Sequence, residues 1–346
     1  MQLMGCDVAA LNTVHFSNHT GYRQFKGTRA TAEEITALYE GLTQSNLLDF
    51  DVMLSGYAPS AAAVEAVGAI GMDLQRKAEK NPGSFFWGEL PSLSLSLFYV
   101  MASITMRSRL YVNDDVVPAY KKVIRHADLI LPNQFEAEVL SGIKITSLAT
   151  LAEAITALHA IYNIPHVIIT SVQIASLSDS PLPNTLTVIG STTRSDGAPR
   201  LFRIDVPALD CYFSGTGDMF AALTVARFRE AVFNADPTLR STKSWVSPDD
   251  VPATELPLAQ STRKVLASMH CVLEKTLEAR DAELRAIVPD EGEKLLSQED
   301  QQKRAHLRES KAAEVRVVRH AQYLREPEVE FQASEWRRED LPAQFR

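Results

Sequence analysis

Short apolar runs alternate with longer stretches of helical periodicity along most of the chain. A short apolar run bounded by turn residues is typical of a buried strand, and apolar residues spaced three or four apart indicate an amphipathic helix. The predicted strands are 8–14, 51–57, 127–131, 166–170, 185–189 and 201–206. The predicted helices are 32–48, 60–80, 116–126, one from Glu136, one capped by Thr150, 219–232 and 256–287. This alternation predicts an α/β fold in which helices cover both faces of a mostly parallel sheet.

Composition and charge narrow the class of protein. The chain has 346 residues, 45% of them hydrophobic, which allows one large domain or two small ones. The sequence has no apolar run long enough for a membrane span, and the net charge of −8 argues against a nucleic-acid partner. Cys6, Cys211 and Cys271 are too scattered for a disulfide framework or a zinc site, and no signal peptide opens the chain. We therefore expect a cytoplasmic protein.

Polar residues follow three of the predicted strands at the point where each strand ends. They are Ser55, Asn133 and the pair Thr170 and Ser171. The carboxyl ends of parallel strands meet at one edge of a sheet, and ligands of such folds bind at that edge. The sequence therefore predicts one polar rim.

A glycine-rich turn lies ahead of the predicted helix 219–232. Gly215 and Gly217 flank Thr216, so the backbone can present its N–H groups at a helix N-terminus, which attracts phosphate. The Asp218 carboxylate would repel a resting phosphate there. It suits a general base that takes a proton from a hydroxyl group attacking a terminal phosphoryl group, while the turn amides stabilise the developing charge. An isolated motif of this kind is also compatible with Asp218 as a helix cap and the glycines as a plain turn.

Several distinctive strings occur together in the sequence. They are NHTGY at 18–22, SGY at 55–57, LPNQFEAE at 131–138, VIITS at 167–171 and GTGDMFAA at 215–222. Together they resemble the fungal form of the pyridoxal kinase family, which is part of the ribokinase-like superfamily. The resemblance implies a ribokinase-like three-layer sandwich as a single domain over 1–334. It implies ATP-dependent phosphorylation of the 5′-hydroxymethyl group of pyridoxal, pyridoxine or pyridoxamine in vitamin B6 salvage. It also implies Mg²⁺, a monovalent cation such as K⁺, a homodimer, and a cytoplasmic location with the nucleus as a second compartment.

The resemblance implies roles for matching residues on the nucleotide side. Asp218 matches the base that activates the 5′-hydroxyl group, and Asn133 and Glu136 match an Asn-x-x-Glu element whose carboxylate helps to hold magnesium. The residues that match the anion hole and the ATP site are Gly215, Thr216, Gly217, Thr170, Ser171, Asn133 and Phe213. For Phe213 the structural alternative is a core aromatic, and for Thr170 it is a strand-end cap.

Four further matches lie on the vitamer side. Thr20 and Tyr57 match positions around the pyridine ring, and Phe16 matches an aromatic wall of the same pocket. Tyr111 matches a tyrosine on the flap that covers the site. For Phe16 the structural alternative is again a core aromatic.

The sequence departs from the family pattern in two places. Family members begin with a central strand and its loop ahead of the segment that starts here at Met1, so we expect Met1 to be an internal start. They also carry Asp-Pro-Val-Met-Gly-Asp, whose aspartates organise cations and phosphates, where this chain has a Leu/Ser-rich run over 88–108. Glu89 is the only acidic residue of that run, and nothing in the sequence suggests that it substitutes for them. We interpret 88–108 as an aberrant insertion, translated from an intron or a shifted frame, and expect impaired activity.

The C-terminal part of the chain is rich in charge. The segment 289–312 is expected to be a charged helical or mobile insertion, and 335–346 a flexible tail. Two rival hypotheses remain for the whole chain. One is another ribokinase-like kinase, such as one acting on hydroxymethylpyrimidine. The other is a non-catalytic relative that binds ligand or an intact subunit without transferring phosphate.

Overall fold

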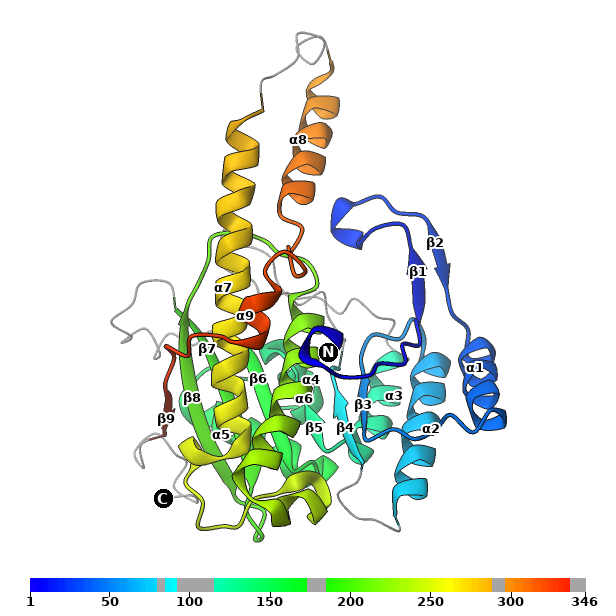
Figure 1. Ribbon diagram of the computed structural model, residues 1–346, viewed down its shortest axis with the longest axis vertical. Coiled ribbons are helices and arrows are strands. Elements are labelled where there is room, and N and C mark those ends of the chain that lie inside the picture. The colour runs from blue at the N-terminus through cyan, green and yellow to red at the C-terminus, as the bar shows by residue number, and fades with distance from the viewer. Residues whose placement is uncertain (80–84, 92–114, 173–184, 288–295, 337–346) are drawn as a thin grey trace.

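The computed structural model describes residues 1–79, 85–91, 115–172, 185–287 and 296–336. Within these residues one sheet of seven strands forms the centre of the molecule (Figure 1). In spatial order the strands are β3 (Val52–Ser55), β4 (Phe86–Glu89), β5 (Leu129–Ile130), β6 (His166–Val172), β7 (Thr185–Thr193), β8 (Pro199–Pro207) and β9 (Ala333–Glu335). The strands from β3 to β6 pair in parallel, and β7 to β9 extend the sheet antiparallel. The parallel part confirms the fold predicted from the alternating pattern.

Helices cover both faces of this sheet. One face carries α1 (Ala32–Gln44), α2 (Ala61–Ala78), α3 (Val116–Val123), α4 (Gln134–Ser141) and α5 (Leu148–Tyr162). The other carries α6 (Thr216–Ala235), α7 (Pro257–Arg285) and the short α9 (Ala321–Arg325). Neighbouring strand residues point to opposite faces, so Trp87 packs among α1–α5 whereas Phe86 packs against α6 and α7. The result is a ribokinase-like three-layer sandwich.

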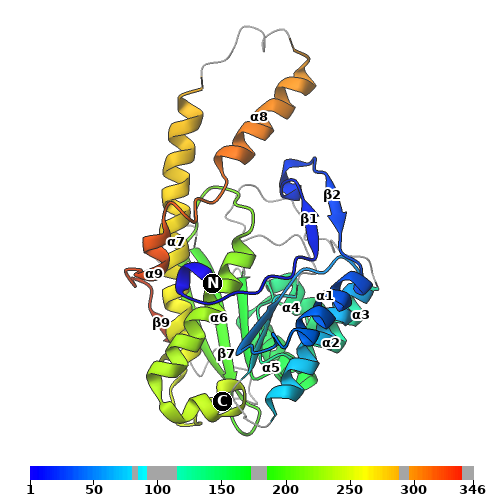
Figure 2. The same cartoon turned by 45° about the vertical axis from the view of Figure 1, so that its right-hand side comes forward.

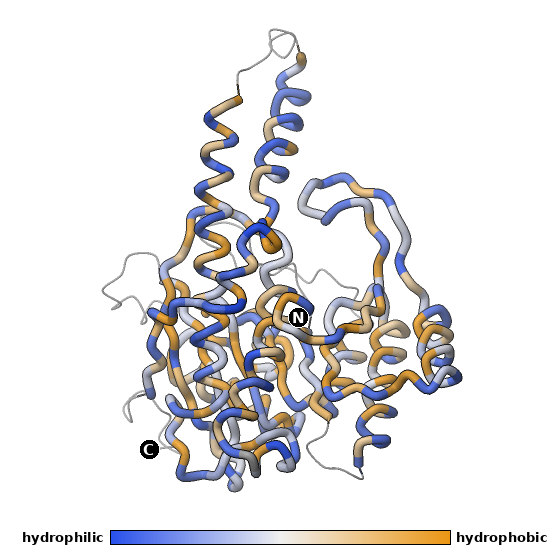
Figure 3. The backbone as a smooth tube through the Cα atoms, viewed as in Figure 1, coloured by the Kyte–Doolittle hydropathy of each residue, from blue (hydrophilic) through white to orange (hydrophobic). Residues whose placement is uncertain are grey.

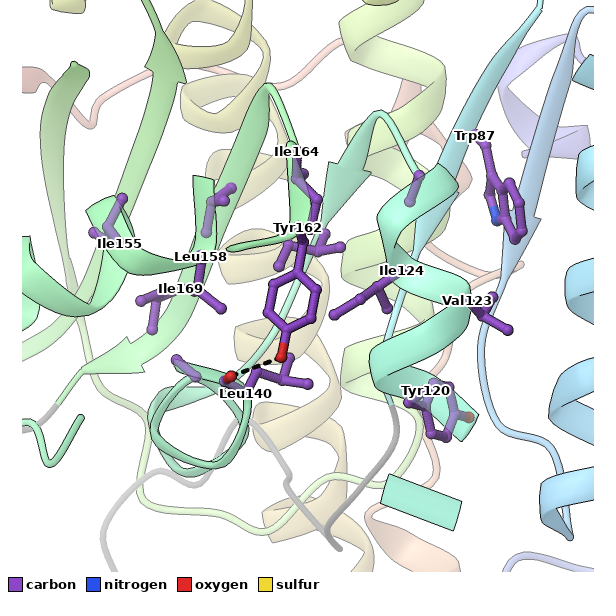
Figure 4. Close-up of a cluster of buried hydrophobic side chains, with 14 of the residues drawn as sticks. Trp87, Tyr120, Val123, Ile124, Leu140, Ile155, Leu158, Tyr162, Ile164 and Ile169 are labelled. Atoms are coloured by element: carbon purple, nitrogen blue, oxygen red, sulfur yellow. Dashed lines mark hydrogen bonds between the residues drawn. The ribbon is translucent and has the colours of Figure 1, made fainter. Parts of the chain in front are cut away.

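Two apolar cores hold the layers together. The core under α1–α5 is shown in Figure 4, where the Tyr162 hydroxyl donates a 2.7 Å hydrogen bond to the Leu140 carbonyl and so ties α5 to the end of α4. In the second core, the Phe86 ring stacks on Trp245 at a centroid distance of 4.3 Å. No described helix is both long and apolar enough to cross a membrane.

Two elements stand away from the sandwich. A hairpin of β1 (Val14–Phe16) and β2 (Gly27–Arg29) carries a short 3-10 turn, Thr20–Tyr22, at its tip (Figure 2). A helical arm lies on the other side of this turn (Figure 1). It is formed by the C-terminal end of α7 and by α8 (Gln298–Ala312). Polar residues dominate α8 along its length (Figure 3). The turn and the lower end of the arm face each other.

Most predicted helices are confirmed, and three boundaries are corrected. The strand predicted over 8–14 is found only at Val14–Phe16, because β1 finds its one partner in β2 and the residues before Val14 have no neighbouring strand. The helix predicted from Met219 begins at Thr216, so Asp218 lies in its first turn. The helix assigned to a Thr150 cap is capped by Ser147, whose hydroxyl accepts from the Thr150 amide.

The structure also changes the boundaries of two segments named from the sequence, the run 88–108 and the tail 335–346. Gly88 and Glu89 belong to β4, pair with β3 on one side and β5 on the other, and are therefore part of the sheet rather than of an insertion. Only 88–91 of the 88–108 run fall within the described residues. Glu335, the first residue of the expected tail, ends β9 and pairs with Phe202. Because β3 pairs directly with β4, the described sheet is continuous from β3 to β9.

Candidate active site

The glycine-rich turn forms the N-terminus of α6, as its sequence suggested. Gly215 is the N-cap with a φ of 77°, a left-handed conformation that favours glycine, and the Met219 amide returns a bond to its carbonyl. Thr216 is 1% exposed, and its hydroxyl has no hydrogen-bond partner in the described part of the chain. A buried hydroxyl without a partner costs free energy, so its presence beside free helix amides indicates a site that an anion completes.

Asp218 lies in the first turn of the same helix. Asp218 as a whole is exposed. The surrounding chain nevertheless excludes enough water from its carboxyl to raise the pKa of this group above its ordinary value. No hydrogen bond or ion pair from the described residues engages this carboxyl. A raised pKa makes the carboxylate a better proton acceptor, which is what a general base needs.

The ends of β5 and β6 lie together, as expected from their parallel pairing. Thr170 forms a parallel β-bridge to Asn133, and the Thr170 amide donates a 3.0 Å hydrogen bond to the Pro132 carbonyl. Ser171 follows at an irregularity in the β6 register, with a φ of 58°. Its hydroxyl is buried and has no partner among the described residues. A strained residue with an unsatisfied hydroxyl at a strand end is typical of a ligand site.

Asn133 and Glu136 form a capping box at the start of α4. The Asn133 side chain accepts from the Glu136 amide at 2.9 Å, and the Glu136 carboxylate accepts from the Asn133 amide at 3.0 Å. Glu136 is 2% exposed. The pair therefore has a structural role, and it also places a buried carboxylate at the polar rim.

Glu89 is the residue of this rim that the sequence did not reveal. It ends β4, is 2% exposed, and accepts a hydrogen bond from the Ser55 hydroxyl. Burial raises the pKa of its carboxyl to about 7, although hydrogen bonds from Ser55 and Trp87 favour the charged form. Glu89 and Glu136 both act on the buried Tyr120 phenol, whose pKa is raised first by burial and then by these carboxylates. The two carboxylates therefore converge on one neighbourhood.

The neighbouring residue links Glu89 to α6. Leu90 lies against Gly56, and also against Gly217, where a Cβ would sit 3.9 Å from a Leu90 methyl group. The N-terminus of α6 thus borders the ends of β3 and β4. A signal in the sequence could have indicated this: Glu89 closes a short apolar strand, the same position that Asn133 and Thr170 hold on theirs.

The vitamer-side residues come from the hairpin and from the end of β3. Thr20 opens the 3-10 turn at the hairpin tip. The Tyr212 hydroxyl, from the loop before α6, lies 3.5 Å from where a Cβ on Gly21 would be, so the turn closes over that loop. Tyr57 follows β3, and its carbonyl accepts a 2.7 Å bond from the Thr13 hydroxyl just before β1. The base of the hairpin is thereby held at the rim.

Two aromatic residues take structural positions. Phe16 packs against Phe25 within the hairpin, with ring centroids 4.6 Å apart and planes tilted by 47°, and the Arg29 guanidinium lies over its ring. It is therefore a hairpin aromatic rather than a residue of the sandwich core. Phe213 is 1% exposed and belongs to the core between the sheet and α6, which is the structural alternative considered for it. Tyr111 lies outside the described residues.

Curated relatives resemble this chain over most of its length. A protein of Schizosaccharomyces pombe named as a pyridoxal kinase is 33% identical over 278 residues, covering 80% of this chain and 79% of the relative. Human pyridoxal kinase is 36% identical over 239 residues, covering 65% of this chain and 69% of the relative. The chain belongs to the pyridoxal kinase family.

Structural comparison agrees with the family. Pyridoxal kinase from Leishmania donovani, in complex with ADP and pyridoxamine, matches with a TM-score of 0.68 and 26% identity, covering 97% of this chain and 92% of that chain. A family model described as phosphomethylpyrimidine kinase matches residues 100–247, which include the α6 turn. The pyridoxal kinase fold is therefore kept in this chain, with the polar rim at the carboxyl ends of its parallel strands.

Proposed function

We propose that this chain is an active pyridoxal kinase that transfers the γ-phosphoryl group of ATP to the 5′-hydroxymethyl group of pyridoxal, pyridoxine or pyridoxamine. One observation carries the proposal. The first turn of α6 combines helix N-terminal amides with the buried Thr216 hydroxyl and the Asp218 carboxyl, neither of which has a partner among the described residues. The loop that leads into this turn borders the hairpin tip that bears Thr20. A base beside an anion hole is the arrangement that phosphoryl transfer requires.

The chain's residues divide the chemistry between them. Asp218 accepts the proton of the 5′-hydroxyl group as its oxygen bonds to the γ-phosphorus, and the bond from that phosphorus to the β,γ-bridging oxygen breaks to release ADP. The amides of the Gly215–Gly217 turn stabilise the charge on the transferred oxygens. Their positions are fixed before the reaction, so no reorganisation is needed at the transition state.

Contacts to the nucleotide and the vitamer follow from the same geometry. We propose that Thr170, Ser171 and Asn133 line the channel for the ATP phosphates, because they end neighbouring strands beside α6. Thr20 and Tyr57 then border the vitamer from the hairpin side, with Phe16 shaping the hairpin wall. The unpartnered Ser171 hydroxyl supports the first of these assignments.

The residues present fit a magnesium ion that is held largely by the substrate. No cluster of three or more His, Cys, Asp or Glu side chains suited to a metal occurs within the described residues. Mg²⁺ commonly uses one or two carboxylates together with phosphate oxygens and waters. The buried carboxylates of Glu136 and Glu89 match that mode, and they would hold the ion near the phosphates. When bound, the ion supplies neutralisation of phosphoryl charge.

Three further properties are proposed on the family resemblance alone. They are a requirement for a monovalent cation such as K⁺, a homodimer, and a cytoplasmic location with the nucleus as a second compartment. Sedimentation of the purified chain would test the dimer directly. Phosphorylation in buffers that contain only a large organic cation would test the K⁺ requirement.

Two observations support activity despite the departures from the family pattern. The described sheet is continuous from β3 to β9, and Glu89 supplies a buried carboxylate at the polar rim. The proposed function is tested by ATP-dependent formation of pyridoxal 5′-phosphate by the purified chain. We expect turnover on the order of 1 per second or more.

Asp218→Asn is the control for this assay, and hydroxymethylpyrimidine is the competing substrate. The variant should lose about 100-fold or more of the turnover while it still binds ATP. A folded wild-type chain without turnover on any vitamer would contradict the proposed function. Faster turnover on hydroxymethylpyrimidine would assign the chain to the rival activity.

A further inference from the structure

The 3-10 turn at the hairpin tip is held by residues far away in the sequence. The Tyr22 hydroxyl donates a 2.9 Å hydrogen bond to Glu314 Oε1, across 292 positions of the chain. His19 Nε2 lies 3.3 Å from the same oxygen. On the adjoining helix, His306 Nε2 lies 3.0 Å from the Gly21 carbonyl oxygen. These contacts join the turn to α8 and to the residues just after its C-terminal end, which lie on the hairpin side of α7 in Figure 1.

The hydrogen bonds of the turn define which atoms donate. The Gly21 amide donates to His19 Nδ1 at 3.1 Å, so Nδ1 is the acceptor and the proton of a neutral ring is on Nε2, facing Glu314. The Gly21 carbonyl can only accept, so His306 Nε2 donates to it. Burial and Glu314 raise the pKa of the Tyr22 phenol to about 12, which keeps it protonated. The Tyr22 hydroxyl, His19 Nε2 and His306 Nε2 thus all donate hydrogen bonds across the contact.

Tyr212 borders the turn on the side opposite the helical arm. A Cβ on Gly21 would lie 2.8 Å from His19 Nδ1 and 3.5 Å from the Tyr212 hydroxyl of the loop that leads into α6. Tyr212 therefore closes one side of the turn, and the helical arm closes the other. Thr20 is covalently fixed between the two clamped residues, His19 and Gly21.

We propose that Glu314 and His306 are positioning residues for the vitamer site, and that the helical arm clasps the hairpin turn so that Thr20 is held over the α6 N-terminus. The inference rests on the proposed function, because it is Thr20 in a vitamer pocket that the clasp would serve. It gives the charged segment 298–312 a task beyond that of a solvated insertion. Neither Glu314 nor His306 needs to touch the substrate.

Variants of Glu314 separate this account from a plain surface ion pair. Glu314→Ala removes the acceptor shared by His19 and Tyr22, whereas Glu314→Gln keeps an oxygen acceptor and removes only the charge. Because the Gln side-chain oxygen can still accept from Tyr22 and from His19 Nε2, Gln should rescue the function that Ala loses. Glu309, an exposed carboxylate on α8 shortly before Glu314, offers the matched control Glu309→Ala.

The experiment combines steady-state kinetics with hydrogen exchange on the full chain. For Glu314→Ala we expect the KM for pyridoxal to rise by about three- to tenfold, since the hydrogen bonds lost are partly solvated, while the KM for ATP stays within about twofold. Exchange in a peptide spanning 17–24 should accelerate, with α1 unchanged. Glu314→Gln and Glu309→Ala should resemble the wild type in every readout.

Two results would overturn the clasp. One is unchanged exchange over 17–24 in Glu314→Ala, and the other is faster exchange with an unaltered KM for pyridoxal. If the wild-type chain phosphorylates no vitamer, the proposed function fails by itself. The clasp is then judged from pyridoxal binding by calorimetry in the same variants. Affinity equal to that of the wild type, or no binding to the wild type, would overturn it.

Discussion

The Glu89 carboxyl accepts a hydrogen bond from the Ser55 hydroxyl where two neighbouring parallel strands end. The Trp87 indole donates to the same hydroxyl at 2.6 Å, so the carboxyl, the hydroxyl and the ring form one buried group. A carboxyl without a cationic partner is costly to bury in the core of a sheet. Its place at the polar rim therefore supports the proposal that phosphate and magnesium ligands bind there.

Replacing Glu89 tests this explanation. Glu89→Gln keeps the volume and the acceptor for Ser55 but removes the charge. We expect kcat/KM for magnesium-ATP to fall by about 10- to 100-fold, because one carboxylate near the phosphate-bound cation is lost. Affinity for pyridoxal should change little, as measured by calorimetry without nucleotide. Unaltered nucleotide kinetics would show that the Glu89 carboxyl has no part in the site.

Replacing Ser171 should increase stability and decrease activity. Its φ of 58° is strained for a serine, and its buried hydroxyl has no partner in the described chain. Ser171→Gly should relieve the strain and stabilise the fold by up to about 1 kcal/mol, seen as a higher midpoint in urea. The same change should raise the KM for ATP. A variant that is neither more stable nor weaker for ATP would contradict both parts of the argument.

The raised pKa of the buried Asp128 carboxyl predicts that the stability of the fold depends on pH. Its carboxyl accepts from the Trp87 amide at 2.7 Å and from the Ser244 hydroxyl, yet burial raises its pKa from 3.8 to about 6. Because the folded state holds this proton more tightly, the contribution to stability is complete below about pH 4 and is lost as the pH rises through about 6. For a pKa shift of this size, the free energy of unfolding falls by about 3 kcal/mol over this pH range.

Asp128→Asn should remove that dependence. Relative to the wild type, the variant should become more stable by up to about 3 kcal/mol between pH 4 and pH 7, measured by urea unfolding at several pH values. Asp7→Asn, at an exposed position, is the control and should follow the wild type. A difference between Asp128→Asn and the wild type that does not change with pH would refute the assignment.

Gly21 in the hairpin turn and Gly41 in helix α1 should respond in opposite ways to replacement by alanine. At Gly21 a new Cβ would meet His19 atoms at 2.8 and 2.9 Å, so Gly21→Ala should displace the turn and raise the KM for pyridoxal. At Gly41, exposed on α1, a Cβ meets nothing within 4 Å. Gly41→Ala should therefore stabilise the helix by about 1 kcal/mol and leave the kinetics unchanged. Thermal unfolding and vitamer kinetics on both variants check the pair.

Many of the secondary-structure elements could be predicted from the sequence, because they depend on local chemistry. The apolar periodicity of α2 and α6 and the short apolar runs of β5 and β6 depend on residues close in sequence, so their types were predictable. The Thr31–Glu34 capping box at the start of α1 likewise depends on two residues only three positions apart. The glycine turn and Asp218 were likewise contained within one short motif.

The contacts that complete the site could not be read in this way. Glu89 closes a short apolar run but stands in a segment that departs from the family pattern, and its pairing with β3 and β5 is what places it at the rim. Glu314 meets Tyr22 across 292 positions, a partnership that no local pattern encodes. Sequence by itself determined the elements, the family and the reacting turn, since these follow from short-range periodicity and motif chemistry. Tertiary structure alone decided which distant side chains share a neighbourhood, because burial and long-range contact depend on how the whole chain packs.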